Sequence, residues 1–438
     1  MAKTFRPWDV EQKWLLPPSV LDLVPEGHVA HFIRDTVRES LDLSALLGSY
    51  GEERGYPPYH PTMMTALLLY AYTQGIYSSR KIAKACEERV DFMAVTALQK
   101  PDFRTVNEFR KRHLKELGEL FFQVLELCRQ AGLAKLGHVS LDGSKVRANA
   151  SKHKAMSYAR MKKAERELTR EVESWFRRAE AVDTQENQQF GAGKRGDELP
   201  AWVANKQQRL AKIREAKAAL EAEAQRKDPA PPDDEQPRRG RPRKHPPGIP
   251  KPKAQRNFTD PESRIMKTRD GFQQCYNVQT AVDADSQVIV ACGVTQSATD
   301  RHQLKPLVAK IEAHFGRNPK EVSADSDYCT EENLEELDRR RICGYVATGK
   351  QQHGQPVPIG NRKSDGPLRQ RMRRRLRAGG FRSRYRLRKQ TSEPVFGQIK
   401  AARGFRQLLL RGSKKVTGEW SIVCTAHNLL KLARAVAP

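Results

Sequence analysis

Long apolar runs, paired cysteines and histidine–cysteine groups are all missing from this 438-residue sequence. No segment approaches the ~20 apolar residues that a membrane span needs, and the N-terminus lacks the apolar core of a signal peptide. The seven cysteines are scattered, without a CxxC pair or a nearby histidine at zinc-ligand spacing. These absences predict a soluble, cytoplasmic protein with buried reduced thiols and no contact with a membrane.

Acidic residues are also in short supply. Lys and Arg outnumber Asp and Glu by 79 to 52, which leaves a formal net charge of +27. Such an excess favours a polyanionic partner, and nucleic acid is the first candidate. A ribosomal or chromatin protein would show the same charge, so the excess indicates a partner rather than a fold. In a bacterium it would place the protein with the nucleoid.

The stretch 61–130 has the periodicity of helices. A first apolar helix ends near Gly75, a second follows, and a third has the capping-box spacing of Thr105 and Glu108 and runs to Gly132. Two helices joined by a turn, with basic residues on the second, can bind DNA. Any small helical domain would look similar, so both interpretations stay open.

Strand and helix patterns alternate in the rest of the chain. Residues 139–146 read as a strand, and 155–226 as a helical hairpin that breaks around 186–198. The charged, Pro-rich stretch 228–256 is predicted to be a disordered loop. Further predicted strands cover 272–284, 286–295, 320–328 and 343–349, and the predicted helices include 331–340, 419–435 and one that Asp300 caps. This order predicts an α/β fold with a mixed sheet and flanking helices.

Acidic residues occur at distinctive places in this order. Asp142 ends or interrupts the first strand, Asp325 follows the strand of 320–328, and ligands gather at the carboxyl ends of strands in open sheets. Asp327 is two residues further on and would point to the same side of an extended strand, so periodicity does not choose between Asp325 and Asp327. Each acid by itself is most simply a cap or a turn residue.

A third acid, Glu393, follows the most basic stretch of the chain. Thr391 or Ser392 is predicted to cap a helix in which Pro394 occupies the first turn. Lys400 lies seven residues further on, nearly two full turns and roughly 10 Å along such a helix. It would therefore share the face of Glu393 and hold a DNA phosphate, although an ordinary exposed lysine explains it as well.

Carboxylates in this number suit Mg²⁺, which prefers oxygen ligands. Two such ions activate an attacking oxygen and stabilise a leaving one in displacement at phosphorus. The three acids therefore indicate a metal-dependent site for phosphoryl transfer if the fold gathers them.

Several stretches resemble the DDE transposases of bacterial insertion sequences, in the branch with a helical N-terminal domain and an insertion after the first strand of the catalytic domain. The matching text is "YHPTMMTALLLYAYTQGIYSSRKIAKACEE", "LDGSKVRANASKHKAMSY", "DPESRIMKTRDGFQQCYNVQTAVD", "ADSDYCTEENLEEL" and "EPVFGQIKAARGFRQLLLRG". These stretches are spread along nearly the whole chain outside the interior of the insertion.

The resemblance implies a ribonuclease-H-like catalytic domain whose acids are Asp142, Asp325 and Glu393, with Lys400 as the downstream basic residue. Asp327 stands where the family usually has glycine, and its role is left open. The implied activity is cleavage of double-stranded DNA at the terminal inverted repeats of an insertion sequence, followed by joining of the 3′-hydroxyl ends to target DNA. Two Mg²⁺ ions, or Mn²⁺ in their place, and a homodimer or higher multimer are implied with it.

The predicted division of the chain has three parts. Residues 1–130 form a helical domain for DNA-end binding and multimerisation. Residues 131–150 and 258–438 form the ribonuclease-H-like domain. Residues 151–257 are a helical-hairpin insertion that includes the basic loop of about 228–256.

Two basic segments are predicted to bind DNA phosphates. The first, 362–389, leads directly into the helix of Glu393. The second, "RRGRPRK" at 238–244, resembles the core of an AT-hook for the minor groove, although a basic Pro/Gly linker with non-specific attraction explains it more simply. The predicted DNA-contacting side chains are Lys400, Arg386, Arg388, Lys389, Arg241 and Arg243.

Two other functions share these features. A nuclease that hydrolyses DNA without joining strands would use the same acids, because water and a 3′-hydroxyl attack through one site. A non-catalytic DNA-binding protein descended from a transposase would keep the charge, but none of the three acids is missing.

Overall fold

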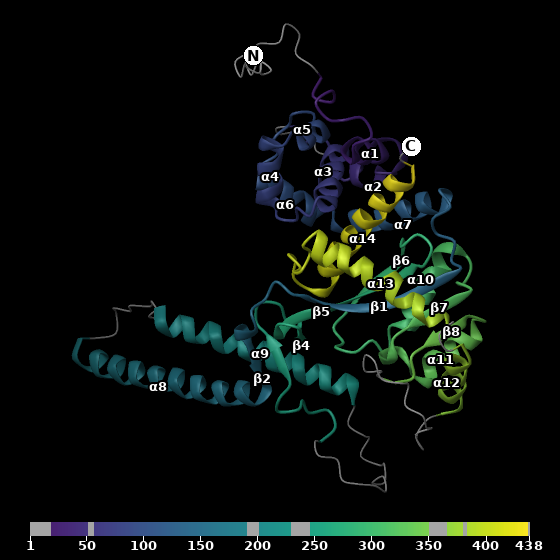
Figure 1. Cartoon of the computed structure of the whole chain (residues 1–438). Helices are drawn as coiled ribbons and strands as arrows, with labels where there is room; N and C mark the ends of the chain where they lie inside the picture. Colours follow the sequence, from purple (N-terminus) through teal and green to yellow (C-terminus); the bar gives the residue numbers. More distant parts are fainter. Residues whose placement is uncertain are drawn as a thin grey trace, which may run out of the picture.

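The computed structural model describes residues 19–50, 57–190, 201–228, 246–349, 366–379 and 383–436, apart from the side chains of 179–190 and 201–202. A group of helices from the N-terminal part lies against a mixed sheet, and two long helices project from the other side of that sheet (Figure 1). This arrangement confirms the predicted α/β class and is consistent with a ribonuclease-H-like domain joined to a helical domain.

The N-terminal part is entirely helical in its described residues. Its α-helices are α1 (Val29–Asp35), α2 (Ser44–Leu47), α3 (Pro61–Thr73), α4 (Ser79–Glu88), α5 (Val90–Thr96), α6 (Phe103–Arg112) and α7 (Leu114–Gln130). The predicted single helix after Thr105 is wrong in two respects. Asp102 caps α6, and its side chain accepts hydrogen bonds from the N–H groups of Arg104 and Thr105. The helix is interrupted at His113, before α7 begins.

The sheet is mixed, as predicted. Its strands are β1 (His138–Arg147), β4 (Arg264–Thr268), β5 (Gly271–Asp283), β6 (Ile289–Thr295), β7 (Glu321–Ala324) and β8 (Cys343–Val346). Their order is β4-β5-β1-β7-β8, and β6 also pairs with β5. β1 is antiparallel to β5 and parallel to β7, so it lies at the change of direction within the sheet.

Helices that follow the strands pack on this sheet. They are α10 (Leu304–Phe315), α11 (Glu331–Arg339), α12 (Pro367–Gly379), α13 (Leu387–Gly397) and α14 (Ser413–Val436). Sequence periodicity missed β4 and α12, since β4 is short and α12 is dense in arginine. Asp300 does not cap α10, whose N-cap is Gln303.

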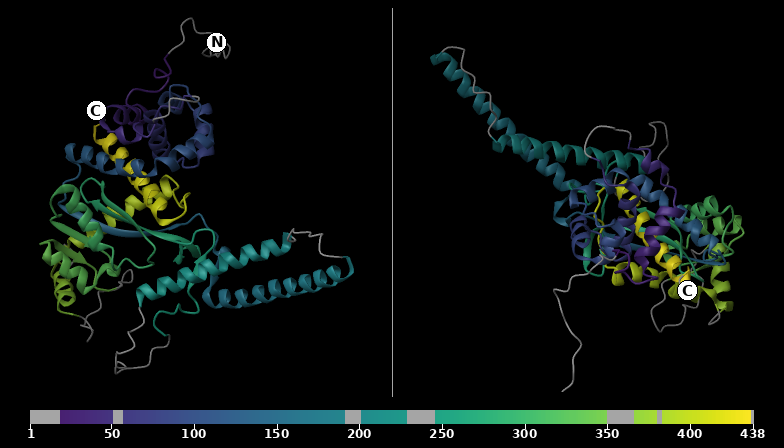
Figure 2. Two further views of the ribbon diagram at one scale, coloured as in Figure 1. Left: turned by 180° about the vertical axis from the view of Figure 1, so that it is seen from behind. Right: turned by 90° about the horizontal axis from the view of Figure 1, so that it is seen from above.

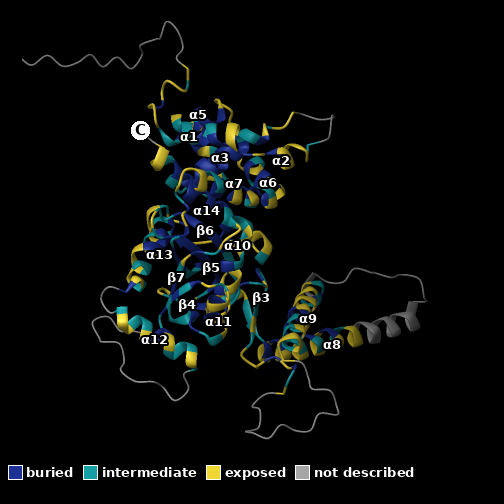
Figure 3. Cartoon of the chain, turned by 90° about the vertical axis from the view of Figure 1, so that its right-hand side faces the viewer, coloured by how far each residue is buried: buried dark blue, intermediate teal, exposed yellow. Residues whose placement is uncertain are grey.

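The helix α14 joins the two halves of the molecule. It packs against α7 and α3 on one side and β6 on the other, and Trp420 within it is fully buried. Buried residues continue without a gap from the N-terminal helices through α14 into the sheet (Figure 3). The orientation of the helical part relative to the sheet is therefore set by packing and not by a linker.

The insertion forms a helical hairpin that extends far from the body of the molecule (Figure 2). Its arms are α8 (Tyr158–Phe190) and α9 (Ala201–Lys227), and its base is the strand pair β2 (Ala155–Ser157) and β3 (Gln255–Asn257). A separate small core, which includes Met161 and Ile213, holds the arms together. The predicted disordered loop is corrected at its C-terminal end, because 246–256 packs against the hairpin and contains the start of β3.

None of the helices in the described ranges has both the length and the apolar character that crossing a bilayer requires.

Candidate active site

Two of the three predicted acids lie side by side where β1 and β7 part. Ser140 of β1 pairs with Ser323 of β7 in parallel register. Continuing this register by two residues sets Asp142 beside Asp325, on the face of the sheet that the two serines share. β7 ends before this point, whereas β1 continues along β5. The acids therefore stand where the pairing of β1 with β7 has ended.

The third acid is carried by α13 (Leu387–Gly397), which packs on this part of the sheet. The prediction that Glu393 begins a helix with Pro394 in its first turn is wrong, because α13 begins at Leu387. Thr391 and Ser392 are not caps. Their hydroxyls lie inside the helix and approach the carbonyl oxygens four residues back at 2.6 and 3.1 Å.

A side chain from the sheet makes a proline possible inside α13. Pro394 has no N–H to donate, so the Gln390 carbonyl lacks its helical partner. The side chain of Gln287, in the turn between β5 and β6, donates to this oxygen at 3.2 Å. Gln287 therefore replaces the lost helix bond and fastens α13 to the sheet.

Serine hydroxyls connect α13 to β1 next to the acids. Ser392 Oγ accepts from Ser140 Oγ at 3.2 Å and lies 3.3 Å from Asp142 Oδ2. This contact orients the Asp142 carboxylate toward the face that α13 covers.

Burial raises the pKa of both acids on the sheet, Asp142 and Asp325. It raises the pKa of Asp142 to about 6, an effect that Asp325 strengthens and the Arg388 guanidinium opposes. Burial likewise raises the pKa of Asp325, although the Asp327 backbone N–H and Arg388 stabilise its charged form. Anions held at this cost favour a cation between them.

Arg388 is the cation that the structure shows there. Its Nη1 atom lies 3.8 Å from Asp142 Oδ2 and 3.7 Å from Glu393 Oε1, and Asp325 also acts on its charge. The side chains of Arg388 and Asp142 are each only 14% exposed. Nε and Nη1 of Arg388 are buried and donate no hydrogen bond to any described residue. We call Asp142, Asp325 and Glu393 around Arg388 the acidic centre.

The carboxylate oxygens of the acidic centre are suitable ligands for a divalent metal, but they stand too far apart to share one ion. Across the described ranges, no three His, Cys, Asp or Glu side chains stand close enough to share one ion. However, the carboxylates of Asp142 and Glu393 converge on one cation and Asp325 acts on its charge. A divalent ion offers such hard oxygen donors more charge than a guanidinium does. The residues therefore fit Mg²⁺ or Mn²⁺ if Arg388 is withdrawn.

Asp327 does not lie on an extended strand, so the argument that it shares the side of Asp325 is wrong. β7 ends at Ala324, and Ser326–Tyr328 form a 3₁₀ turn. The Asp327 N–H donates to Asp325 Oδ1 at 2.9 Å. Asp327 thus positions Asp325 through its backbone, while its charge adds repulsion.

A buried polar network behind the acidic centre was missed by sequence reasoning. Asp300 Oδ1 accepts from Asn277 and Gln279, each at 2.6 Å, and the Tyr328 hydroxyl donates to Gln279. A Cβ atom on Gly143 would lie 2.3 Å from Gln279 Nε2, so only glycine fits beside Asp142. The available signal was a pair of amides, Asn277 and Gln279, at alternate positions of strand β5.

Lys400 lies close to Asp142, but not for the predicted helical reason. The α-helix gives way to a π-helical turn, Gln398–Ala402, before the lysine is reached. Lys400 Nζ donates to Ser144 Oγ at 2.6 Å and to the Lys145 carbonyl at 2.7 Å, next along β1 from Asp142. Burial lowers the pKa of Lys400 to about 8. Its contact with a DNA phosphate stays a prediction.

Two family models match the chain. "Transposase domain (DUF772)" matches residues 18–112, and "Transposase DDE domain" matches residues 348–433. Each match covers less than half of the chain, so these two stretches are similar to transposase domains. The resemblance to the DDE transposases of insertion sequences is thereby confirmed. The DDE match contains Glu393 and Lys400, whereas Asp142 and Asp325 lie outside both matches. No curated protein and no solved structure matches the chain.

The predicted DNA-contacting residues of the DDE domain divide into two groups. Arg386 and Lys389 are exposed just before and within the start of α13, whereas Arg388 faces the acidic centre. Arg241 and Arg243 of the AT-hook-like segment lie outside the described residues.

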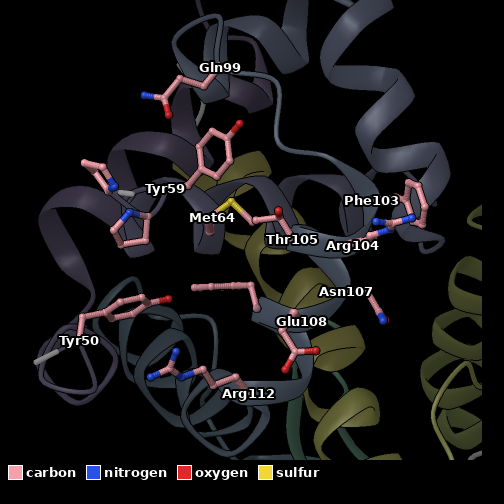
Figure 4. Close-up of a pocket in the computed structure, with 13 residues that line it drawn as sticks. Tyr50, Tyr59, Met64, Gln99, Phe103, Arg104, Thr105, Asn107, Glu108 and Arg112 are labelled. Carbon is pink, nitrogen blue, oxygen red and sulfur yellow. The ribbon is translucent and has the colours of Figure 1, made fainter. Parts of the chain in front are cut away.

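A cavity of about 960 Å³ opens in the N-terminal helical part (Figure 4). Every residue that lines it falls within the match over 18–112. Aromatic and basic side chains meet at its rim, where the Arg112 guanidinium lies 5.2 Å from the ring of Tyr50 and that of Arg104 lies 5.7 Å from the ring of Phe103. This combination suits contact with nucleic acid.

Proposed function

We propose that this protein is a DDE transposase that cuts DNA at the terminal inverted repeats of an insertion sequence and joins the 3′-hydroxyl ends to target DNA. One observation carries the proposal, in a chain that matches a transposase DDE domain: strand register sets Asp325 beside Asp142, and α13 brings Glu393 to the same cation as Asp142.

The three acids would hold two divalent ions, which supply activation of the attacking oxygen and stabilisation of the leaving one. Asp327 and Ser392 would orient the carboxylates of Asp325 and Asp142. Arg388 would leave the acids when the metals bind. Because its side chain is long and remains charged, it would then bind a phosphate of the DNA.

The exposed cations around α13 would hold the duplex. Arg386 and Lys389 precede Glu393 and are open to solvent. Lys400 would contact another phosphate, next to the residues of β1 that follow Asp142. Binding through several Lys and Arg contacts releases counterions, so DNA affinity should fall steeply as salt rises. A flat response to salt would remove these side chains from the proposal.

The N-terminal transposase domain would bind the transposon end. Its aromatic cavity offers rings for stacking on exposed bases and arginines for phosphates. Tyr50→Ala should then weaken binding of end-containing DNA more than binding of an unrelated duplex, as measured by fluorescence anisotropy; an equal loss for both would leave the cavity without a role in end recognition. The three-part division of the chain and a homodimer or higher multimer belong to the same proposal.

A non-catalytic DNA-binding protein is the second candidate, and one observation favours it. The acids stand too far apart to share an ion, and Arg388 stands among them. A nuclease without strand joining would use the acids as a transposase does.

One reaction separates the three functions. Purified protein is incubated with Mg²⁺, a duplex bearing the DNA ends that flank this reading frame, and a supercoiled plasmid. A joined duplex–plasmid product supports the transposase. Cleaved duplex without joined product indicates a nuclease, and bound but uncut duplex indicates a non-catalytic binder.

A further inference from the structure

A small cavity lies at the opposite end of α13 from its start, against the C-terminal half of α14. Its volume is about 90 Å³, room for roughly three water molecules. Arg403, His427, Lys431 and Arg434 line it together with Gln398. We call this group of three cations and one histidine the basic cavity.

The histidine of the basic cavity is neutral and adds no compensating charge. Arg403 Nη2 donates to His427 Nδ1 at 2.9 Å. The other ring nitrogen, Nε2, must then carry the proton, which it donates to the Gln287 carbonyl at 2.9 Å. Burial and the neighbouring cations lower the pKa of His427 to about 3, in agreement with this tautomer.

The three cations have no anionic partner in the described part of the chain. Arg403 donates only to neutral acceptors, the Gln398 carbonyl and His427. Lys431 donates to the neutral Gln287 Oε1 at 2.9 Å. Burial and mutual repulsion lower the pKa of both Arg403 and Lys431, and no carboxylate acts on either.

Such an arrangement is costly without a ligand. Buried charges in proteins are normally paired, because removing a charge from water costs several kcal/mol per ion. Here Arg403 and Lys431 are half-buried and Arg434 is exposed, and the described residues that line their shared cavity include no carboxylate. A tetrahedral oxyanion is of a size that fits 90 Å³, and arginine and lysine are the usual ligands of phosphate.

We propose that the basic cavity binds a phosphate group, and that a phosphate of the DNA backbone supplies it. The assignment to DNA rests on the proposed function. The cavity adjoins the turn that follows α13, so a phosphate held there would fix the strand near the helix that carries Glu393. Gln287 connects the two sites, because its side chain bonds both Lys431 and the Gln390 carbonyl of α13.

The test uses the full-length chain and two charge-matched variants. Lys431→Gln/Arg434→Gln removes two cations of the basic cavity. Lys414→Gln/Lys415→Gln removes two exposed lysines from the other end of α14 and serves as the control. Arg434→Gln alone is the milder variant, since Arg434 is exposed and its loss leaves the Lys431 bond to Gln287 intact.

The first arm measures Tm in sodium phosphate and in sodium chloride at equal ionic strength and pH, without DNA or metal. Phosphate at about ten times its Kd should raise the Tm of the wild type and of the control by about 2 °C. The cavity variant should show no such rise, and Arg434→Gln a smaller one. Equal rises in all four proteins would overturn the proposal, as would no rise in the wild type.

The second arm measures duplex affinity against salt concentration. The cavity variant should bind about tenfold more weakly than the control, and the slope of log affinity against log salt should fall by about 1. A lost phosphate effect with control-like DNA affinity would mean that the cavity takes free phosphate, which overturns its assignment to DNA. Because the first arm needs neither DNA nor cleavage, a failure of the transposase function leaves its outcome unaffected.

Discussion

The acidic centre and the basic cavity lie at two ends of the same helical segment, α13 and the π-helical turn that follows it. They differ in whether the chain supplies a counter-charge. Two carboxylates of the acidic centre, Asp142 and Glu393, face the guanidinium of Arg388, and Asp325 acts on its charge. Three cations in the basic cavity face only neutral oxygen and nitrogen atoms. The first site therefore carries an internal substitute for its ligand, whereas the second one does not.

Because of this difference, binding a ligand costs more free energy at the acidic centre than at the basic cavity. A ligand of the acidic centre must displace Arg388, so its affinity is lowered by the ion pairs that are lost. A ligand of the basic cavity displaces nothing and relieves repulsion. The four predictions below act on this contrast, beginning with the largest effect.

Loss of one carboxylate from the acidic centre should abolish catalysis. Asp142→Asn should reduce strand cleavage by on the order of 10³-fold or more, because the metals lose a ligand. Duplex binding should stay nearly unchanged, since the arginines are intact. Gel analysis of cleaved duplex measures the first effect and fluorescence anisotropy the second.

The matched control for this loss is Asp327→Asn, which removes an acid beside the site but keeps the backbone N–H that Asp325 uses. It should be much milder than Asp325→Asn. The reverse ranking would mean that Asp327 is the metal ligand.

Asp142→Asn should also stabilise the folded protein in the absence of metal. The pKa of Asp142 is about 6 when folded against a usual value of 3.8, so the folded protein binds more protons between these values. Wild-type stability therefore falls as pH rises from about 4 to about 6, and stays at the lower level above it. Asparagine does not titrate, and at pH 8 it should add on the order of 2 kcal/mol.

Denaturation of both proteins in EDTA between pH 4.5 and pH 8 measures this difference. We expect the stability difference between Asp142→Asn and the wild type to grow as the pH rises from 4.5 to about 6. Equal stability at pH 8 would show that Arg388 compensates the buried charge completely.

Removing the internal cation should make the acidic centre more like the basic cavity. Arg388→Gln should raise the affinity for Mn²⁺ about tenfold, because the metal no longer competes with a guanidinium. Electron paramagnetic resonance of free Mn²⁺ measures it without any catalytic readout. Lys389→Gln, an equal loss of charge at an exposed position of α13, should leave the affinity unchanged. Weaker binding in Arg388→Gln would make the arginine a support of the site instead of a competitor.

The smallest effect concerns the side chain that connects the two sites. Gln287→Ala should cost about 1 kcal/mol of stability, since it leaves the Gln390 carbonyl without a partner. In a Pro394→Ala background the helix can bond that carbonyl itself, so the cost should shrink. Chemical denaturation of the four proteins gives the coupling energy. A cost that is the same in both backgrounds would mean that Gln287 acts elsewhere.

Local patterns were reliable wherever a residue's neighbours in sequence are also its neighbours in space. Alternating apolar residues located β1, β5 and β6, and helical periodicity located α8 and α9. They failed where a distant group intervened. Pro394 looked like a helix start because the side chain that replaces its missing N–H, Gln287, is 103 positions away from the Gln390 carbonyl to which it donates.

The candidate site shows the same division. Asp142, Asp325 and Glu393 were identified from their places in the order of strands and helices and from the family resemblance. The polar partners were not, because Asp300 and Gln279 have ordinary local roles until β5 and the segment before α10 are brought together. Arg388 was predicted to face DNA, since nothing in a basic run shows which arginine turns inward.

The sequence by itself determined the composition of this protein's chemistry: a surplus of positive charge, three separated acids, a mixed sheet and a helical insertion. Only the tertiary structure decided which charges meet. Parallel register set one aspartate beside another, and the path of α13 turned Arg388 toward them. The packing of α14 left Arg403 and Lys431 with only neutral hydrogen-bond acceptors among the residues that the structure describes. Electrostatic energies depend on distance and burial, and neither quantity exists until the chain has folded.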